Sequence, residues 1–313
     1  MKRRHFAIIA LALLLAAPFY WLMVEGEPDP VAPAAIDLAE LRELADGMPG
    51  ERPVRIDGLV TAVWGKSGNL LAAGTGFRAS QLSATGYVVG YSDGPPVVID
   101  TGLTRAGAAA RKADFFSAER RETLDKAIAN ARAIVVTSAD GDHLGALTGR
   151  ADLAPLAERL LLGENQRSAM ELTGWPQESR ERIRLAPLDR PIAVAPGVVR
   201  IPAPGARPDR AMVYVRLANG REVLFAGDNA VTYSAMQRGT LPARLFSNWI
   251  DPIDRAGASR WILGLRRFRD RHPNVTIVTG HDAGTAKSEF RNARGALGTI
   301  HFGLEEEGMF EAI

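Results

Sequence analysis

Residues 137–143, Thr137-Ser138-Ala139-Asp140-Gly141-Asp142-His143, decide the fold of this chain. They follow directly on the apolar run 134–136, which is typical of a buried β-strand. Asp228 and His281 follow two further apolar runs of the same kind. Side chains at strand ends can converge on one rim of a sheet, and carboxylates and imidazoles bind zinc, manganese or iron without thiolates. Without other signals, an Asp-Gly-Asp sequence also fits a solvated turn.

Composition narrows the class of protein. With 313 residues, 46% hydrophobic and 24% charged, the chain can bury a large core. The formal charge of +2 comes with basic residues scattered among acids, so we expect no nucleic-acid partner. Cysteine is absent, which excludes disulfides, thiolate ligands and cysteine nucleophiles. Any metal ligands must therefore be His, Asp or Glu.

The N-terminus has the pattern of a membrane signal. Residues 1–5 are basic and residues 6–24 are apolar and uncharged, a run that would span roughly 28 Å as a helix. We expect a cytoplasmic basic segment, a single-pass transmembrane anchor over 6–24 in the inner membrane, and a periplasmic domain after it. A cleaved signal peptide is the alternative, with 32–34 as the nearest small-x-small site.

The remaining chain divides into a linker and one domain. Within residues 25–51, the stretch 25–35 contains three prolines and 36–45 has a helical pattern, which predicts an extended linker and a short helix. Residues 52–313 form the folded domain. Within it, Asn219-Gly220 predicts a hairpin.

Strands and helices succeed one another in two groups along the domain. Helices are expected over 117–132, with Ser117 as N-cap, and over 255–271. β-rich segments precede both helices. The order predicts an α/β protein of two packed sheets with helices outside, an αββα four-layer sandwich.

Five landmarks in order resemble the metallo-β-lactamase superfamily over nearly the whole exported part, from about Arg52 onward. They are Val98-Ile99-Asp100-Thr101-Gly102, the 137–143 loop, Pro204-Gly205-Ala206-Arg207-Pro208-Asp209, Leu224-Phe225-Ala226-Gly227-Asp228 and Gly280-His281. The loop stands where the family has Thr-His-x-His-x-Asp-His. The resemblance implies the αββα fold and a metal-dependent hydrolase.

The resemblance also divides the metal ligands into two groups. The family's first metal site uses three histidines, and this chain has Ser138, Asp140 and Ala206 at those positions. A centre of two ions sharing a hydroxide is therefore not expected.

The second site is retained in full. Its ligand positions correspond to Asp142, His143, Asp228 and His281. The resemblance thus implies one divalent ion, zinc in the first place and manganese or iron as alternatives. From the residues alone, these side chains could instead cap turns or pair with neighbouring acids.

The function expected from this loop is hydrolysis of a small molecule at a single metal site. In that hypothesis the ion's water is the nucleophile and Asp140 is the general base. The competing hypothesis is a non-catalytic domain that binds a ligand or partner in the old cleft, and a third is a purely structural metal. The fold alone does not name a substrate.

Overall fold

The computed structural model describes residues 2–147, 150, 153–170, 175–292 and 297–301. Its strands form two sheets. The eight-stranded sheet has the order β13-β1-β2-β3-β5-β6-β7, with β4 paired to β1, and the five-stranded sheet has the order β12-β11-β10-β9-β8. The strands are β1 Arg55–Ser67, β2 Ala79–Gly90, β3 Val97–Ile99, β4 Phe115–Phe116, β5 Ala133–Val135, β6 Leu160–Gly163, β7 Arg184–Ala186, β8 Ile192–Ala195, β9 Val198–Pro202, β10 Ala211–Arg216, β11 Glu222–Gly227, β12 Val275–Thr279 and β13 Gly298–His301.

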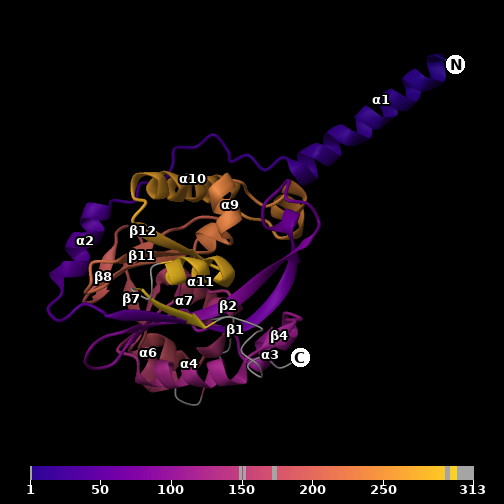
Figure 1. Ribbon diagram of the computed structural model, residues 1–313. Helices are drawn as coiled ribbons and strands as arrows, with labels where there is room; N and C mark the ends of the chain where they lie inside the picture. Colours follow the sequence, from indigo (N-terminus) through magenta and orange to yellow (C-terminus); the bar gives the residue numbers. More distant parts are fainter. Residues whose placement is uncertain (1, 148–149, 151–152, 171–174, 293–296, 302–313) are drawn as a thin grey trace.

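Helices cover the outer faces of both sheets (Figure 1). The α-helices are α1 Lys2–Phe19, α2 Leu38–Gly47, α3 Arg105–Ala110, α4 Ala118–Asn130, α5 Gly141–Leu144, α6 Leu153–Ala157, α7 Glu164–Met170, α8 Gln177–Glu181, α9 Tyr233–Arg238, α10 Arg255–Arg271 and α11 Ala283–Asn292. α4 and α6 lie on the eight-stranded sheet, and α2 and α10 lie on the five-stranded sheet. One apolar core fills the space between the sheets, and α11 contributes Phe290 to it. The layers are those of an αββα sandwich.

Local chemistry explains the two main outer helices. The hydroxyl of Ser117 accepts from the backbone N–H of Arg120, which confirms the predicted N-cap of α4. Asp254 caps α10 in the same way through Gly257. α10 turns an apolar face, with Leu265 fully buried, onto the five-stranded sheet.

Two strand pairings bring the ends of three strands to one edge of the five-stranded sheet. β10 and β11 form the predicted antiparallel hairpin at Asn219-Gly220, with Gly220 at a φ of +82°. β11 then pairs in parallel with β12. As a result the ends of β11 and β12 and the start of β10 lie on the same rim.

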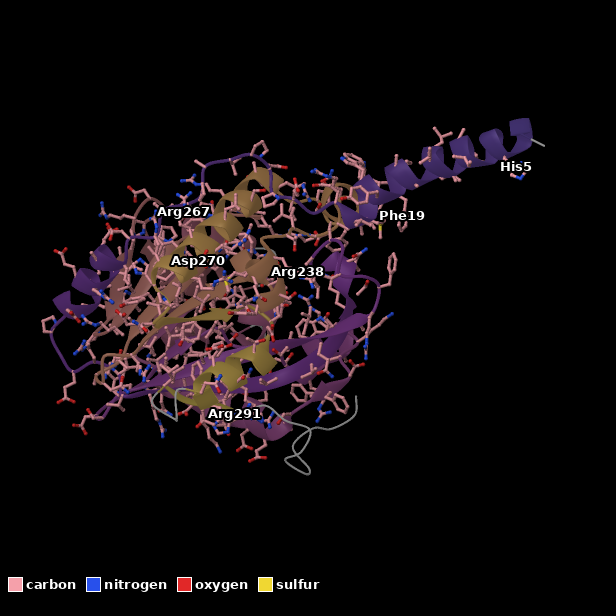
Figure 2. The ribbon with its side chains drawn as sticks, turned by 45° about the horizontal axis from the view of Figure 1, so that its top comes forward. His5, Phe19, Arg238, Arg267, Asp270 and Arg291 are labelled. Atoms are coloured by element: carbon pink, nitrogen blue, oxygen red, sulfur yellow. The ribbon has the colours of Figure 1, made fainter. Side chains whose placement is uncertain are left out.

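The prediction of a transmembrane anchor over 6–24 is not borne out. Among the residues that the structure describes, no helix has both the length and the apolar character needed to cross a membrane. The apolar run is divided between α1, which also contains the basic residues 2–4, and a separate π-helix over Tyr20–Val24. Figure 2 shows α1 projecting away from the domain, with His5 near its outer end and Phe19 near its inner end.

The segment expected to be a linker packs along the domain. Leu38, Leu41 and Ala45 of α2 are buried against the five-stranded sheet. Upstream, the backbone N–H of Ala34 donates to the carbonyl of Arg260 in α10 at 2.9 Å. The short helix predicted over 36–45 therefore contributes to the core.

Candidate metal centre

The predicted site residues meet on one rim of the sandwich. Asp100 follows β3, and Asp142 and His143 lie in α5, which follows β5 and its loop. Asp228 follows β11, and His281 follows β12. Three of these residues follow strands of the eight-stranded sheet and two follow strands of the five-stranded sheet, so the site lies where the two sheets meet.

His143 is fixed by contacts at its Nδ1 atom. That atom lies 2.9 Å from Oδ2 of Asp100 and 3.0 Å from the hydroxyl of Thr137. Asp100 in turn accepts from the backbone N–H and the hydroxyl of Thr137, at 2.7 and 2.8 Å. The carboxylate favours the tautomer with the proton on Nδ1, which leaves Nε2 as a lone pair facing the site.

Asp100 adopts an unusual backbone conformation to make these contacts. Its φ is +55°, a value that residues other than glycine rarely adopt. Such strained positions persist where the surrounding contacts determine them. Here the strain accompanies a carboxylate that orients a buried imidazole.

His281 is oriented in a similar way by a backbone group. Its Nδ1 lies 2.8 Å from the carbonyl oxygen of Ser83 in β2, to which it donates. The backbone N–H and hydroxyl of Ser83 both return hydrogen bonds to the carbonyl of His281, at 3.0 and 3.1 Å. In the neutral form of His281, the lone pair of Nε2 therefore also faces the site.

The two Nε2 atoms converge on the same carboxylates. Oδ1 of Asp228 lies 3.2 Å from Nε2 of His143 and 3.0 Å from Nε2 of His281. Oδ2 of Asp142 lies 3.4 Å from Nε2 of His281. Asp142, His143 and His281 offer ligand atoms that all lie within 4.8 Å of one another.

This donor set fits a divalent transition metal. Nε2 of His143 and Oδ1 of Asp228 are buried and have no hydrogen-bond partner among the described residues. Lone pairs on nitrogen and oxygen thus face one another, an arrangement that needs either protons or a cation between them. Two imidazoles and two carboxylates are a known ligand combination for zinc, manganese or iron.

In the metal-free protein, the surrounding charges favour protons between these nitrogen and oxygen atoms. Burial disfavours the charged form of His143, but Asp228 and Asp100 raise its pKa well above the ordinary value. The pKa of His281 is likewise raised, because Asp228 and Asp142 outweigh its burial. Burial would raise the pKa of Asp228, yet His143 and Arg210 hold it well below its usual range.

Two of the three positions that correspond to the family's first metal site contact an arginine. Nη2 of Arg210, the residue before β10, lies 2.9 Å from Oδ2 of Asp140, and its Nη1 donates to the hydroxyl of Ser138. Nη1 also lies 2.7 Å from Oδ2 of Asp228. Only 6% of the Arg210 side chain is exposed. The third position, Ala206, lines the same cavity and offers no ligand atom.

Asp142 pairs with a different arginine, Arg111. Nη2 of Arg111 lies 2.8 Å from Oδ1 of Asp142, and the Arg111 guanidinium stacks over Trp64 at 5.5 Å from the ring centroid. The Arg111 side chain is 40% exposed. This arginine lies at the mouth of the site, whereas Arg210 lies inside it.

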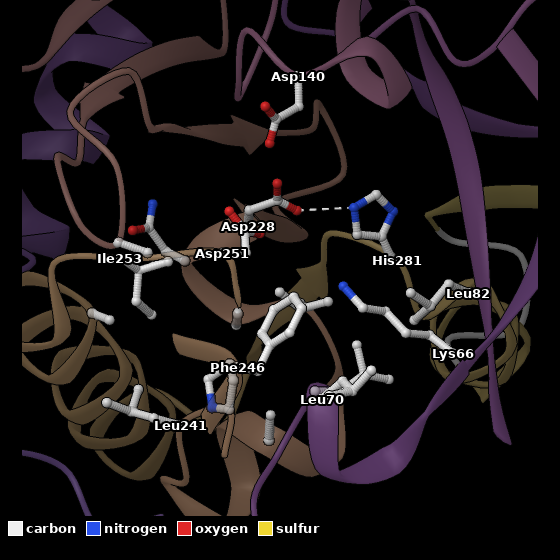
Figure 3. Close-up of a pocket in the computed structure, with 18 of the residues that line it drawn as sticks. Lys66, Leu70, Leu82, Asp140, Asp228, Leu241, Phe246, Asp251, Ile253 and His281 are labelled. Atoms are coloured by element: carbon white, nitrogen blue, oxygen red, sulfur yellow. Dashed lines mark ion pairs between the residues drawn. The ribbon is translucent and has the colours of Figure 1, made fainter. Parts of the chain in front are cut away.

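A cavity of about 180 Å³ opens onto these residues. Figure 3 shows Asp140, Asp228 and His281 at one end and Phe246 and Leu241 at the other. The lining also includes the charged residues Asp142, Arg111, Arg210 and Asp251 and the apolar residues Leu70, Leu71, Pro242, Ile253 and Ile262. The cavity is therefore amphipathic.

Lys66 lies between the two ends of the cavity (Figure 3). Its ammonium group is 4.7 Å from the centroid of the Phe246 ring. Burial lowers the pKa of Lys66.

The structure brings together all of the predicted site residues, and it adds three partners that sequence reasoning did not assign. Asp100 was noted only as a fold landmark, although a carboxylate at a strand end was available as a signal. The carbonyl of Ser83 and the guanidinium of Arg210 carried no such signal, because their roles depend on contacts between distant segments.

Comparison with known proteins gives structural likeness alone. No protein-family model and no curated protein matches the chain. A solved structure described as a quorum-quenching N-acyl homoserine lactone lactonase matches with a TM-score of 0.58 and 16% identity, over 77% of this chain and 97% of its own. An N-acyl homoserine lactone hydrolase, with N-hexanoyl-L-homoserine bound at its catalytic metal centre, matches at 0.57 and 15%, over 76% and 96%.

A third structure extends the likeness beyond the lactone hydrolases. It is described as a probable metal-dependent hydrolase from Staphylococcus aureus, and it matches with a TM-score of 0.54 and 12% identity, over 74% of this chain and 91% of its own. These neighbours are hydrolases of the metallo-β-lactamase superfamily. The resemblance inferred from the five landmarks is confirmed at the level of architecture: the chain has the metallo-β-lactamase fold.

Proposed function

We propose that this protein is a metal-dependent hydrolase that uses one divalent ion, held by Asp142, His143, Asp228 and His281. One observation carries the proposal. Both imidazoles are fixed through Nδ1, so that their Nε2 atoms face Oδ1 of Asp228 at 3.2 and 3.0 Å. Such orientation by a neighbouring carboxylate or carbonyl is typical of metal-ligating histidines. Zinc is the first choice of ion.

An ion at this position, when bound, supplies a Lewis acid and lowers the pKa of a water molecule toward neutrality. The chain's own residues supply the rest. Asp140 lines the cavity with 41% of its side chain exposed, where it can accept a proton from a water molecule. We therefore keep Asp140 as the proposed general base, with its carboxylate held in place by Arg210.

The amphipathic cavity suggests the kind of substrate. A molecule with an apolar chain would place the chain against Phe246 and Leu241 and its polar, hydrolysable group against the carboxylates. Two of the structural neighbours are described as N-acyl homoserine lactone hydrolases, and such lactones have this shape. We propose an ester, lactone or amide that carries an apolar acyl chain.

Metal analysis of the purified full-length protein tests the proposal. After removal of metal with a chelator and reconstitution with zinc, we expect about one equivalent by elemental analysis. His281→Ala and Asp228→Ala should each lose most of that metal, and His272→Ala, at the end of α10, should retain it. A zinc content of the wild-type protein below about a tenth of an equivalent would contradict the proposal.

A non-catalytic ligand-binding domain is the second candidate. Its support is that arginines already contact both ligand carboxylates, since Arg111 pairs with Asp142 at 2.8 Å and Arg210 with Asp228 at 2.7 Å. In that case the protein should bind no stoichiometric metal, and acyl compounds should raise its melting temperature without being hydrolysed. The same zinc titration, followed by thermal shift with and without the compound, separates the two candidates.

Export of the domain to the periplasm is a further proposal. It rests on the basic residues 2–4 that precede the apolar run 6–24. A reporter that is active only outside the cytoplasm, fused after residue 51, should be active in cells. A matched fusion lacking residues 1–24 should not, and equal activity of the two would contradict export.

A further inference from the structure

Asp228 contacts two cationic positions with its two oxygens. Oδ1 faces Nε2 of His143 and Nε2 of His281, whereas Oδ2 lies 2.7 Å from Nη1 of Arg210. The carboxylate is nearly buried, with 8% of its side chain exposed. A buried carboxylate shared in this way has the geometry of a bridge between two positive charges.

The other contacts of Arg210 are with the altered loop. Its Nη2 pairs with Asp140 at 2.9 Å, and its Nη1 donates to the hydroxyl of Ser138. These are two of the three positions at which the chain lacks the histidines of the first metal site. The guanidinium therefore occupies the space between the former ligand positions and the bridging carboxylate.

Asp209 holds the loop in the conformation that these contacts require. Its Oδ2 accepts from the backbone N–H of Ala139 at 2.7 Å and from the hydroxyl of Ser138 at 3.2 Å. The backbone N–H of Asp140 donates to the same hydroxyl at 3.0 Å. Residues 138–140 and 209–210 thus form one hydrogen-bonded unit around the arginine.

We infer that Arg210 replaces the first metal ion of the fold with a fixed cation, so that the centre holds one exchangeable ion at most. The guanidinium neutralises Asp140 and one oxygen of Asp228, as an ion would, but it has no open position for water or substrate. Arg210 is a positioning residue in this account. The inference rests on the proposed metal site for the identity of the remaining ion, but it fails separately, as the tests below show.

The first test is the affinity of the full-length protein for Zn²⁺ alone. A positive charge beside Asp228 repels an incoming cation, so Arg210→Ala should bind zinc at least about tenfold more tightly than the wild type. A merely structural role predicts looser binding, because the loop would lose its anchor. Arg210→Lys retains a cation and should stay within a few fold of the wild type.

Arg42→Ala is the matched control for this substitution. Arg42 forms a two-point ion pair with the buried Glu222, at 2.7 Å for each contact, at the opposite end of β11. Its loss should lower the melting temperature without changing zinc affinity. Unchanged or weaker zinc binding by Arg210→Ala would overturn the inference.

The second test restores the missing histidines. The triple variant Ser138→His, Asp140→His and Ala206→His should still bind no more than one ion, because the guanidinium remains in place. Adding Arg210→Ala should raise the count by one equivalent. A second ion in the triple variant, or no gain in the fourfold variant, would contradict the inference.

The outcomes distinguish this inference from the proposed function. If the wild type binds no zinc, the proposed function fails, and the triple and fourfold variants still decide the role of Arg210. If the wild type binds two ions, the inference fails and the proposed hydrolase remains. If circular dichroism shows that the fourfold variant does not fold, the zinc affinity of Arg210→Ala decides the question.

Discussion

The Nε2 atom of His281 lies 3.0 Å from Oδ1 of Asp228, although the two residues follow different strands of the five-stranded sheet. β11 and β12 are parallel neighbours, so their carboxyl ends meet on one rim. A bulge lies between Phe225 and Gly227, and the pair Gly227–Thr279 is the last before Asp228. Gly227 has a φ of +52°, and a Cβ there would lie 2.6 Å from that of Thr137, so the close approach of the two loops requires glycine.

Asp100, which contacts Nδ1 of His143, should affect metal affinity although it is not one of the proposed ligands. Asp100→Asn keeps the size of the side chain and tolerates the positive φ, but it removes the charge that holds the Nδ1 proton. We expect zinc affinity to fall by about 10- to 100-fold. Isothermal titration would measure it, with Asp57→Asn as control. Equal affinities would show that Asp100 does not orient the ligand.

The stability of the metal-free protein should depend on pH in a defined direction. The pKa values of His143 and His281 are raised above 6.5, so their contribution is fully present below pH 6.5 and is lost as the pH rises through the raised values. The pKa values of Asp142 and Asp228 are lowered from 3.8, so their contribution is present above pH 3.8 and is lost as the pH falls through the lowered values. Melting temperature against pH, measured in chelator, should therefore decline toward alkaline pH.

Zinc should remove that alkaline decline. A bound ion takes the place of the protons on the imidazoles, so metal affinity should rise with pH as those protons leave. The melting temperature with excess zinc should then stay level or rise where that of the metal-free protein falls. Parallel curves with and without zinc would place the ion elsewhere.

The apolar end of the cavity should determine chain-length preference. Phe246→Ala removes an aromatic ring that lines the cavity and contacts Lys66. For long-chain acyl lactones or esters we expect KM to rise about tenfold or more, because a buried aromatic contact is lost, while short-chain compounds change little. A KM series over chain length would measure this, with the exposed Phe77→Ala as control. An equal effect at all lengths would contradict the assignment.

The helix predicted as part of the linker should contribute to the stability of the domain. Leu41 of α2 is 1% exposed and packs against the five-stranded sheet. Leu41→Ala should lower the free energy of unfolding by about 2–5 kcal/mol, whereas the neighbouring surface change Glu43→Ala should have little effect. Urea unfolding would measure both. No loss for Leu41→Ala would mean that α2 folds apart from the domain.

The sequence by itself predicted the architecture and the side chains that gather at the proposed metal site. Apolar strand runs ended by Asp or His are local patterns, and landmarks such as the 137–143 loop and Gly280-His281 placed them in the right order. The helix over 255–271 was predicted at its observed bounds for the same reason, since its apolar spacing is local. The anchor expected over 6–24 is not borne out, since no described helix is long and apolar enough to cross a membrane.

Tertiary structure alone decided what surrounds that position. The carbonyl of Ser83 orients His281 across 198 residues of chain, and Arg210 reaches Ser138 across 72. Such partners are set by strand register and loop packing, which no local pattern records. The loss of three histidines could be read from the sequence, but the positive charge that takes their place could be found only where the loops after β5 and β9 meet in space.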